Sequence, residues 1–222
     1  MKVILFGATG MVGQGLLREC LLDPTIEHVL SIVRTPTGQK HAKLTELVHK
    51  DFLDYSSIES QLTGYDTCFY CLGVTSSGMS EGDYSRVTYD LTMAAAQTLA
   101  RLNPATTFIF VSGTGTDSTE KGPTMWARVK GKTENALLRL PFKAAYMFRP
   151  AGIQPLHGFK SRTAGYRIIY ALAEPIFPLL KLLLPNYITT TEHLGRAMIR
   201  VAQCGFPKQI LEARDINQVS AV

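Results

Sequence analysis

Apolar residues along the first half of the chain follow two alternating patterns. Short runs of β-branched and aromatic residues predict strands, and stretches with an apolar residue at every third or fourth position predict helices. The strands expected are Lys2–Phe6, His28–Val33, a weaker Glu46–His49, Thr67–Leu72, Thr107–Ser112 and Ala145–Phe148. The helices expected between them are Met11–Leu22, Ser56–Leu62 (capped by Asp54 or Ser56), Tyr84–Leu102 and Thr124–Leu140.

This alternation of strands and helices is typical of βαβ units, which build a parallel sheet with right-handed crossovers. Thr67–Leu72 is apolar throughout, as expected of a strand buried on both faces. The fold class predicted is therefore α/β: a Rossmann-like, doubly wound parallel sheet with helices on both faces and a small C-terminal helical cap.

The last third of the chain changes character. Ser161–Pro185 is strongly apolar, but three prolines interrupt it, and Glu174 and Lys181 lie within its most apolar part, 168–185. We therefore expect proline-broken helices over 168–184, packed on the domain or on a second subunit, rather than a membrane span. Peripheral membrane contact stays an alternative. Beyond it, Thr189–Gln203 predicts a helix capped by Thr191, and Leu211–Ile216 predicts a last edge strand.

Three glycines, Gly7, Gly10 and Gly13, lie between the first strand and the first helix, in the stretch GATGMVG. We expect Gly7 to make the tight turn, Gly10 to allow a ligand close to the backbone, and Gly13 to let helix and strand pack closely. The N-terminus of the helix offers free N–H groups and a positive dipole to an anion. The loop therefore predicts a site for the pyrophosphate of a dinucleotide; a glycine-rich turn without a ligand is the structural alternative.

The end of the second strand bears on which dinucleotide is bound. Proteins that bind NAD usually place an acidic residue there for the ribose hydroxyls, but this chain has Arg34, and no Asp or Glu occurs from His28 to Thr45. A guanidinium can hold a 2′-phosphate through two charge-assisted hydrogen bonds. We therefore favour NADP(H) over NAD(H), although Arg34 can also be read as a solvated surface residue.

These motifs resemble those of the short-chain dehydrogenase/reductase superfamily, in its atypical or extended, epimerase-like branch. The resemblance adds Asp51–Phe52 for the adenine, Cys71–Gly73 for the adenosine ribose, Lys130 for the nicotinamide ribose, and Arg149–Gly152 beside the nicotinamide. It implies that residues 1–155 form the dinucleotide-binding core and 156–222 a cap or substrate-side segment of the same domain. The cofactor-binding residues expected are Gly7, Thr9, Gly10, Met11, Val12, Gly13, Arg34, Asp51, Phe52, Leu72, Gly73, Lys130 and Pro150.

The catalytic part departs from the pattern of this superfamily. Its tyrosine, four residues before the lysine, is replaced by Trp126, and an indole N–H cannot titrate near neutral pH. The position of its serine falls on Gly113, with a hydroxyl residue on either side. The catalytic candidates are therefore Lys130, which positions the ribose, and Ser112, Thr114, Tyr84 or water as the source of the proton.

Two functions are compatible with cofactor-binding motifs that are present and a catalytic tyrosine that is absent. The first is an NADP(H)-dependent oxidoreductase or epimerase-like enzyme acting on a carbonyl or alcohol substrate that the sequence does not identify. The second is a catalytically impaired NADP(H)-binding regulator or redox sensor that binds a partner protein, since intact cofactor motifs beside a missing acid suit such a role.

Composition and charge argue against several other classes of protein, namely nucleic-acid-binding, metal-binding and disulfide-bonded proteins. The chain has 222 residues and a formal net charge of +5, with no basic run of the kind that binds nucleic acid. The five histidines lack metal-ligand spacing, so no metal is expected. Cys68 and Cys71 form a CxxC, but residues three apart on a strand point to opposite faces, so we expect reduced cysteines. These features predict a cytoplasmic protein, monomeric or homodimeric.

Overall fold

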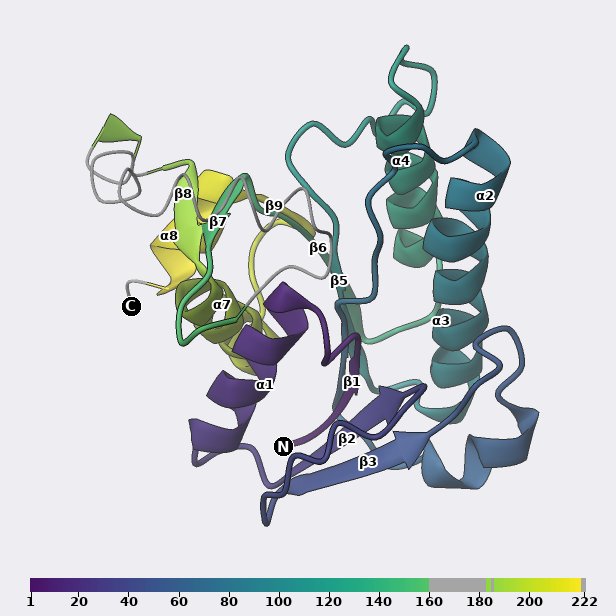
Figure 1. Cartoon of the computed structure of the whole chain (residues 1–222), viewed down its shortest axis with the longest axis vertical. Coiled ribbons are helices and arrows are strands. Elements are labelled where there is room, and N and C mark those ends of the chain that lie inside the picture. The colour runs from purple at the N-terminus through teal and green to yellow at the C-terminus, as the bar shows by residue number, and fades with distance from the viewer. Residues whose placement is uncertain (160–182, 185, 221–222) are drawn as a thin grey trace.

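A computed structural model describes residues 1–159, 183–184 and 186–220. Within them, a sheet of seven parallel strands has the order β3-β2-β1-β4-β5-β6-β9, and β7 pairs with β8 beside it (Figure 1). The strands are β1 (Lys2–Phe6), β2 (His28–Val33), β3 (Leu44–Val48), β4 (Thr67–Tyr70), β5 (Thr107–Val111), β6 (Ala144–Arg149), β7 (Gly152–Gln154), β8 (Ile188–Thr190) and β9 (Ile210–Glu212). The Rossmann-like fold class is confirmed.

Helices connect the strands and cover both faces of the sheet. In the described residues they are α1 (Met11–Leu22), the 3₁₀ turn η1 (Ser56–Gln61), α2 (Glu81–Ser85), the π-helical η2 (Arg86–Asp90), α3 (Leu91–Leu102), α4 (Met125–Leu138), α7 (Thr191–Cys204) and α8 (Ala213–Ser220). The elements α2, η2 and α3 follow one another directly, so the long helix expected after the fourth strand is present with a π-helical turn near its start.

The core has two layers because successive residues of a strand point to opposite faces. On β1, Val3 and Leu5 pack with α1, α7 and α8, whereas Ile4 and Phe6 pack with α3, α4 and the η1 region. In Figure 1, α1 and α7 lie on one side of the sheet and α3 and α4 on the other. The C-terminal residues are part of this architecture, since α7 covers α1 and β9 extends the sheet next to β6.

Two local predictions near the C-terminus were wrong. Thr190, and not Thr191, caps α7: its hydroxyl accepts a hydrogen bond from the N–H of His193 at 3.0 Å, while the Thr191 hydroxyl accepts one from Leu156. The strand expected over 211–216 ends at Glu212. A helix follows because Ala213, Ile216 and Val219 recur at helical spacing.

Other predictions have mixed outcomes. The η1 turn begins after Tyr55, and Asp54 supports it by accepting a hydrogen bond from the N–H of Ser56 at 2.9 Å. Cys68 packs on the α3 face and Cys71 on the α1 face, and both are free thiols. The helices expected over 168–184 lie almost wholly outside the described residues. Among the helices that are described, none combines the length and apolar character needed to cross a membrane.

Candidate cofactor site

The glycine loop after β1 has the geometry that its sequence predicts. Gly7 has φ +82°, and a Cβ there would lie 2.6 Å from the backbone of Cys71 and Leu72. A Cβ on Gly13 would lie 2.1 Å from the carbonyl oxygen of Gly7. Gly10 differs, because its nearest neighbour would be 3.4 Å away. Gly7 and Gly13 are therefore required by packing, while a Cβ on Gly10 would make only an ordinary van der Waals contact with the carbonyl oxygen of Gly7 at the start of α1.

The first turn of α1 presents unused hydrogen-bond donors. The first bond of the helix runs from the N–H of Gln14 to the carbonyl of Gly10 at 2.8 Å. No acceptor is found among the described residues for the N–H groups of Met11, Val12 and Gly13. The Gln14 side chain donates to the carbonyl of Thr9 at 2.9 Å and so fixes the loop, a contact that the sequence analysis missed. Such a terminus is an anion site, and it fits a dinucleotide pyrophosphate.

The other expected cofactor residues follow the carboxyl ends of neighbouring strands. Because parallel strands end at one edge of a sheet, that edge carries Arg34 after β2, Gly73 after β4 and Pro150 after β6. Arg34 is exposed, and it makes no ion pair with any residue that the structure describes. Apart from its chain neighbours, no described residue has a heavy atom within 4 Å of where a Cβ would be on Gly73. In the part of the chain that the structure describes, this edge therefore has space beside Gly73 and an arginine without an ion-pair partner at its β2 end.

Asp51 and Phe52, which follow β3, differ in exposure: the first lies on the surface and the second in the core. Asp51 is exposed, and its Oδ1 accepts a hydrogen bond from the N–H of Leu53 at 3.0 Å. Phe52 is only 6% exposed, and its ring lies edge-on to Phe6 and Tyr55. Core contacts thus occupy most of the Phe52 ring, which limits the surface that it can offer to an adenine.

Helix α4 turns one face toward the loop after β5. Lys130 donates from Nζ to the carbonyl oxygen of Ser112 at 2.8 Å. One turn earlier, the Trp126 ring lies 3.4 Å from where a Cβ would be on Gly115. Burial lowers the pKa of the Lys130 ammonium to about 8, and the carboxylate of Glu134 opposes that shift. The structure therefore brings Lys130 and Trp126 together against the loop 112–115.

The hydroxyl candidates for proton transfer are already engaged. Ser112 is buried and its hydroxyl lies 2.9 Å from that of Thr116, which in turn donates to the carbonyl of Gly113 at 2.8 Å. Thr114 donates from its hydroxyl to the carbonyl of Arg149 at 3.0 Å. Tyr84 is 2% exposed and belongs to the core. None of these side chains offers an exposed phenol in place of the missing tyrosine.

A buried ion pair below this face was not found from the sequence. Arg149, at the end of β6, donates from Nε to Glu134 of α4 at 3.1 Å and from Nη2 at 2.5 Å. The same guanidinium bonds Ser118 at 2.6 Å and Glu212 at 3.1 Å. The spacing of Lys130 and Glu134 on one helix was visible in the sequence, but the pairing of Glu134 with a residue of another strand was not.

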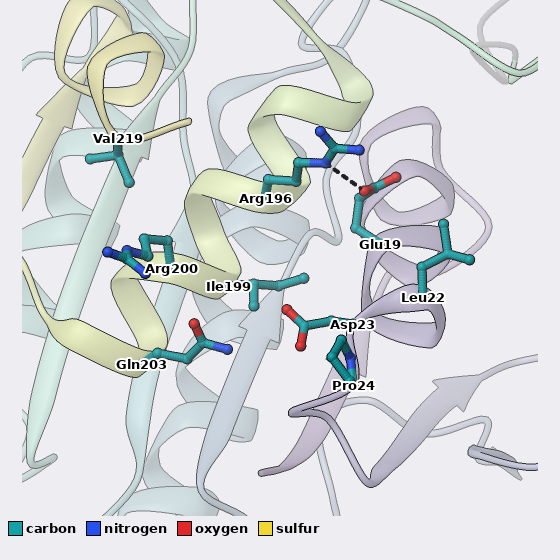
Figure 2. Close-up of a pocket in the computed structure, with 9 residues that line it drawn as sticks. All are labelled: Glu19, Leu22, Asp23, Pro24, Arg196, Ile199, Arg200, Gln203 and Val219. Carbon is teal, nitrogen blue, oxygen red and sulfur yellow. Dashed lines mark hydrogen bonds and ion pairs between the residues drawn. The ribbon is translucent and has the colours of Figure 1, made fainter. Parts of the chain in front are cut away.

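A separate pocket of about 460 Å³ lies between α1 and α7, where Arg196 pairs with the buried Glu19 (Figure 2). It includes Leu22 and Asp23 at the far end of α1, about 18 Å along that helix from the glycine loop. This pocket is therefore not part of the candidate cofactor site.

The fold and the glycine loop together define a dinucleotide-binding protein of the Rossmann type. Residues 7–141 match the NAD(P)H-binding family, and the chain belongs to that family. Among known structures, the fold is similar to the UDP-N-acetylglucosamine 4-epimerase of Methanobrevibacter ruminantium, with a TM-score of 0.70 and 14% identity, over 95% of this chain and 75% of that one. It is also similar to WbmF of Bordetella bronchiseptica, solved with NAD+ and UDP, with a TM-score of 0.69 and 14% identity over 99% and 77%.

Fungal proteins are similar in sequence. The mitochondrial protein fmp52 of Emericella nidulans is 31% identical over 67% of this chain and 65% of its own length, and that of Aspergillus clavatus is 30% identical over 81% and 79%. The matched part of the chain thus spans just under two thirds of the Emericella protein. These relatives carry mitochondrial names, which contradicts the cytoplasmic location predicted from the sequence.

Proposed function

We propose that the protein binds NADP(H) at the carboxyl edge of the sheet and acts as an oxidoreductase or epimerase-like enzyme on a carbonyl or alcohol substrate. The observation that carries the proposal is the glycine loop, in which Gly10 leaves space before three N–H groups of α1 that find no acceptor among the described residues. The substrate would be a small molecule, and the protein a monomer or homodimer.

The preference for NADP(H) rests on Arg34. It stands exposed after β2, where a carboxylate would serve the ribose of NAD, and it has no ion-pair partner in the described part of the chain. A guanidinium can hold a phosphate with two parallel hydrogen bonds. We infer that Arg34 binds the 2′-phosphate and that Asp51 serves the adenine.

The chain's own residues would divide the chemistry as follows. A nicotinamide supplies or accepts a hydride when it is bound. The first turn of α1 would hold the pyrophosphate, with Gln14 keeping the loop in shape through Thr9. Lys130 would orient the nicotinamide ribose, and Pro150 would line the nicotinamide side. A proton for the substrate oxygen would come from Ser112, Thr114, Tyr84 or water.

A second candidate function is supported by Trp126. An indole cannot exchange a proton near neutral pH, and the nearby hydroxyls of Ser112 and Thr114 are bonded to other groups. A protein of this kind would bind NADP(H) without turnover and report its redox state to a partner protein. This regulator is the alternative to the enzyme.

One experiment tests both candidates. Calorimetric titration with NADPH and NADH measures binding, and loss of NADPH absorbance with aldehydes, ketones and quinones measures turnover. Turnover that disappears in Lys130→Ala identifies an enzyme. Tight NADPH binding without turnover identifies the regulator, and failure to bind either cofactor would contradict the proposal as a whole.

A further inference from the structure

The Glu134–Arg149 pair is a buried and nearly saturated contact. Glu134 is fully buried and Arg149 is 8% exposed. Both carboxylate oxygens of Glu134 accept from the guanidinium, whose remaining donors reach Ser118 and Glu212. Replacing such a pair with apolar residues is often neutral or stabilising, so stability alone is a weak reason to bury it.

The pair connects the parts of the molecule that frame Lys130. Glu134 lies one helical turn after Lys130 on α4, so both residues share a face of that helix. Arg149 joins α4 to β6, to β9 through Glu212, and to the loop after β5 through Ser118. The backbone carbonyl of Arg149 also accepts the hydroxyl of Thr114 in the same loop. One guanidinium thus ties α4 to the loop whose Ser112 carbonyl Lys130 contacts.

Lys130 has few charges around it. Burial lowers its pKa to about 8, and Glu134 is the charged group that raises it. Other carboxylates on the described elements that pack near α4 bond to groups other than Lys130. Glu81 of α2 pairs with Arg128, and Asp83 of α2 accepts a hydrogen bond from Ser80. Asp117 accepts one from the hydroxyl of Thr119 in its own loop. Arg149 of β6 is the other charge close by, on the Glu134 carboxylate itself.

From these contacts we infer that Glu134 and Arg149 are positioning residues for Lys130. The pair holds α4 against the loop after β5, and the Glu134 carboxylate keeps the Lys130 ammonium protonated. The consequence for cofactor binding rests on the proposed function, because it needs Lys130 to hold the ribose. The effect on Lys130 itself does not, and it can be measured without any ligand.

The test is the titration of Lys130 in the ligand-free protein, followed by NMR of ¹⁵N-labelled lysine side chains and assigned with Lys130→Arg. In Glu134→Gln, the midpoint of Lys130 is expected to fall by about one pH unit or more, because a close opposite charge has been removed. The matched control is Glu81→Gln, which removes an exposed carboxylate of α2. That carboxylate pairs with Arg128, which lies on α4 as Lys130 does. The control is expected to leave the midpoint unchanged.

A double variant separates positioning from stability. Glu134→Met with Arg149→Met replaces the ion pair by apolar side chains, which the fold is expected to accept. The Lys130 midpoint is expected to fall here as well. An unchanged midpoint in the folded single or double variant would overturn the inference, as would an equal fall in Glu81→Gln.

NADPH titration of the same variants distinguishes this inference from the proposed function. If the positioning role and the proposed function are both correct, NADPH affinity falls as the pH rises and Lys130 loses its proton. In Glu134→Gln this fall is expected at a lower pH than in the unmodified protein. A lowered Lys130 midpoint with unchanged NADPH affinity would support the positioning role and count against Lys130 as the ribose ligand.

Discussion

The β1–α1 turn and the face of α4 lie at the same edge of the sheet but differ in what they retain. At the β1–α1 turn, Gly7 and Gly13 pack backbone against backbone, and Gly10 leaves space before N–H groups that have no acceptor in the described part of the chain. At the α4 face, Lys130 contacts the loop after β5, but Trp126 stands four residues before it, where the superfamily resemblance implies a tyrosine. The features for binding are present, whereas the phenol for proton transfer is missing.

This difference separates two kinds of requirement. Binding at the turn depends on backbone space and backbone donors, which are fixed by the absence of side chains at a few positions. Proton transfer depends on a side chain of suitable pKa, which one substitution removes. A chain can therefore retain the first and lose the second without any change of fold, and each region can be tested separately.

The largest effect is expected from Gly13→Ala at the β1–α1 turn. The new Cβ would lie 2.1 Å from the carbonyl oxygen of Gly7, so backbone must move. The free energy of unfolding, measured by urea denaturation, is expected to fall by about 3 kcal/mol or more. Gly82→Ala is the control, since its nearest contact would be 3.9 Å away. A loss below about 1 kcal/mol for Gly13→Ala would show that this turn is not closely packed.

Gly10→Ala should separate binding from folding at the same turn. Gly10 has φ −82°, which alanine adopts, and its nearest neighbour would be 3.4 Å away. Stability is expected to change by less than about 1 kcal/mol. Affinity for NADPH, measured by calorimetry, is expected to fall at least about tenfold because the methyl group occupies the space for the pyrophosphate. Unchanged affinity would mean that the phosphates lie elsewhere.

The turn and the first strands were predictable because their signals are local. The bounds of β1, α1 and β2 agree with the sequence prediction, since each element has a clear apolar period and ends at a turn. The three-residue strands β7 and β8 were missed because so short a segment has no period. Their pairing joins 152–154 to 188–190, a contact that depends on tertiary structure.

The candidate site was predictable to a similar extent. Gly7, Arg34 and Lys130 could be placed from their positions relative to strands and helices. The buried contact between Glu134 and Arg149 could not, because it depends on how α4 packs on β6. The hydrogen bond between the hydroxyls of Ser112 and Thr116 could not be predicted either, because it depends on the conformation of the loop.

Arg34→Asp tests the cofactor preference at the β2 end of the edge. Removing a charged hydrogen bond is expected to weaken NADPH binding by about 1.5–3 kcal/mol, or roughly 10- to 150-fold, and to spare NADH. Lys40→Asp makes the same charge change in the following loop and is expected to have a much smaller effect. Equal affinities for NADPH and NADH in the unmodified protein would contradict the preference.

The pKa of Lys130 predicts how stability depends on pH at the α4 face. Burial lowers it to about 8 in the folded protein, below its value in the unfolded chain. The unfolded chain therefore binds more protons between about pH 8 and 10.5, and this group's contribution to stability rises with pH over that window. Relative to Lys130→Met, the unmodified protein is expected to gain stability from pH 8 to 10. A constant difference would show that Lys130 is solvated.

The smallest change in activity is expected at Trp126, but its fluorescence gives a direct test of the comparison. It is the only tryptophan of the chain, so its emission reports this position alone. It shares a face of α4 with Lys130, and its ring lies against Gly115. If Lys130 holds the nicotinamide ribose, NADPH must bind close to the indole, quench its emission and accept energy from it.

Trp126→Tyr tests whether the absence of an acidic side chain near Lys130 is the only feature of α4 that prevents proton transfer. The phenol would stand one turn from Lys130, whose ammonium would lower the phenol pKa, so carbonyl reduction by NADPH is expected to rise modestly. The rise stays small because Gly113 supplies no hydroxyl and that of Ser112 is bonded to Thr116. Trp126→Phe is the control, since it changes the ring without adding an acid. Unchanged Trp126 emission at saturating NADPH would contradict the assignment of α4 as the catalytic helix, because an indole in that position cannot be remote from the cofactor.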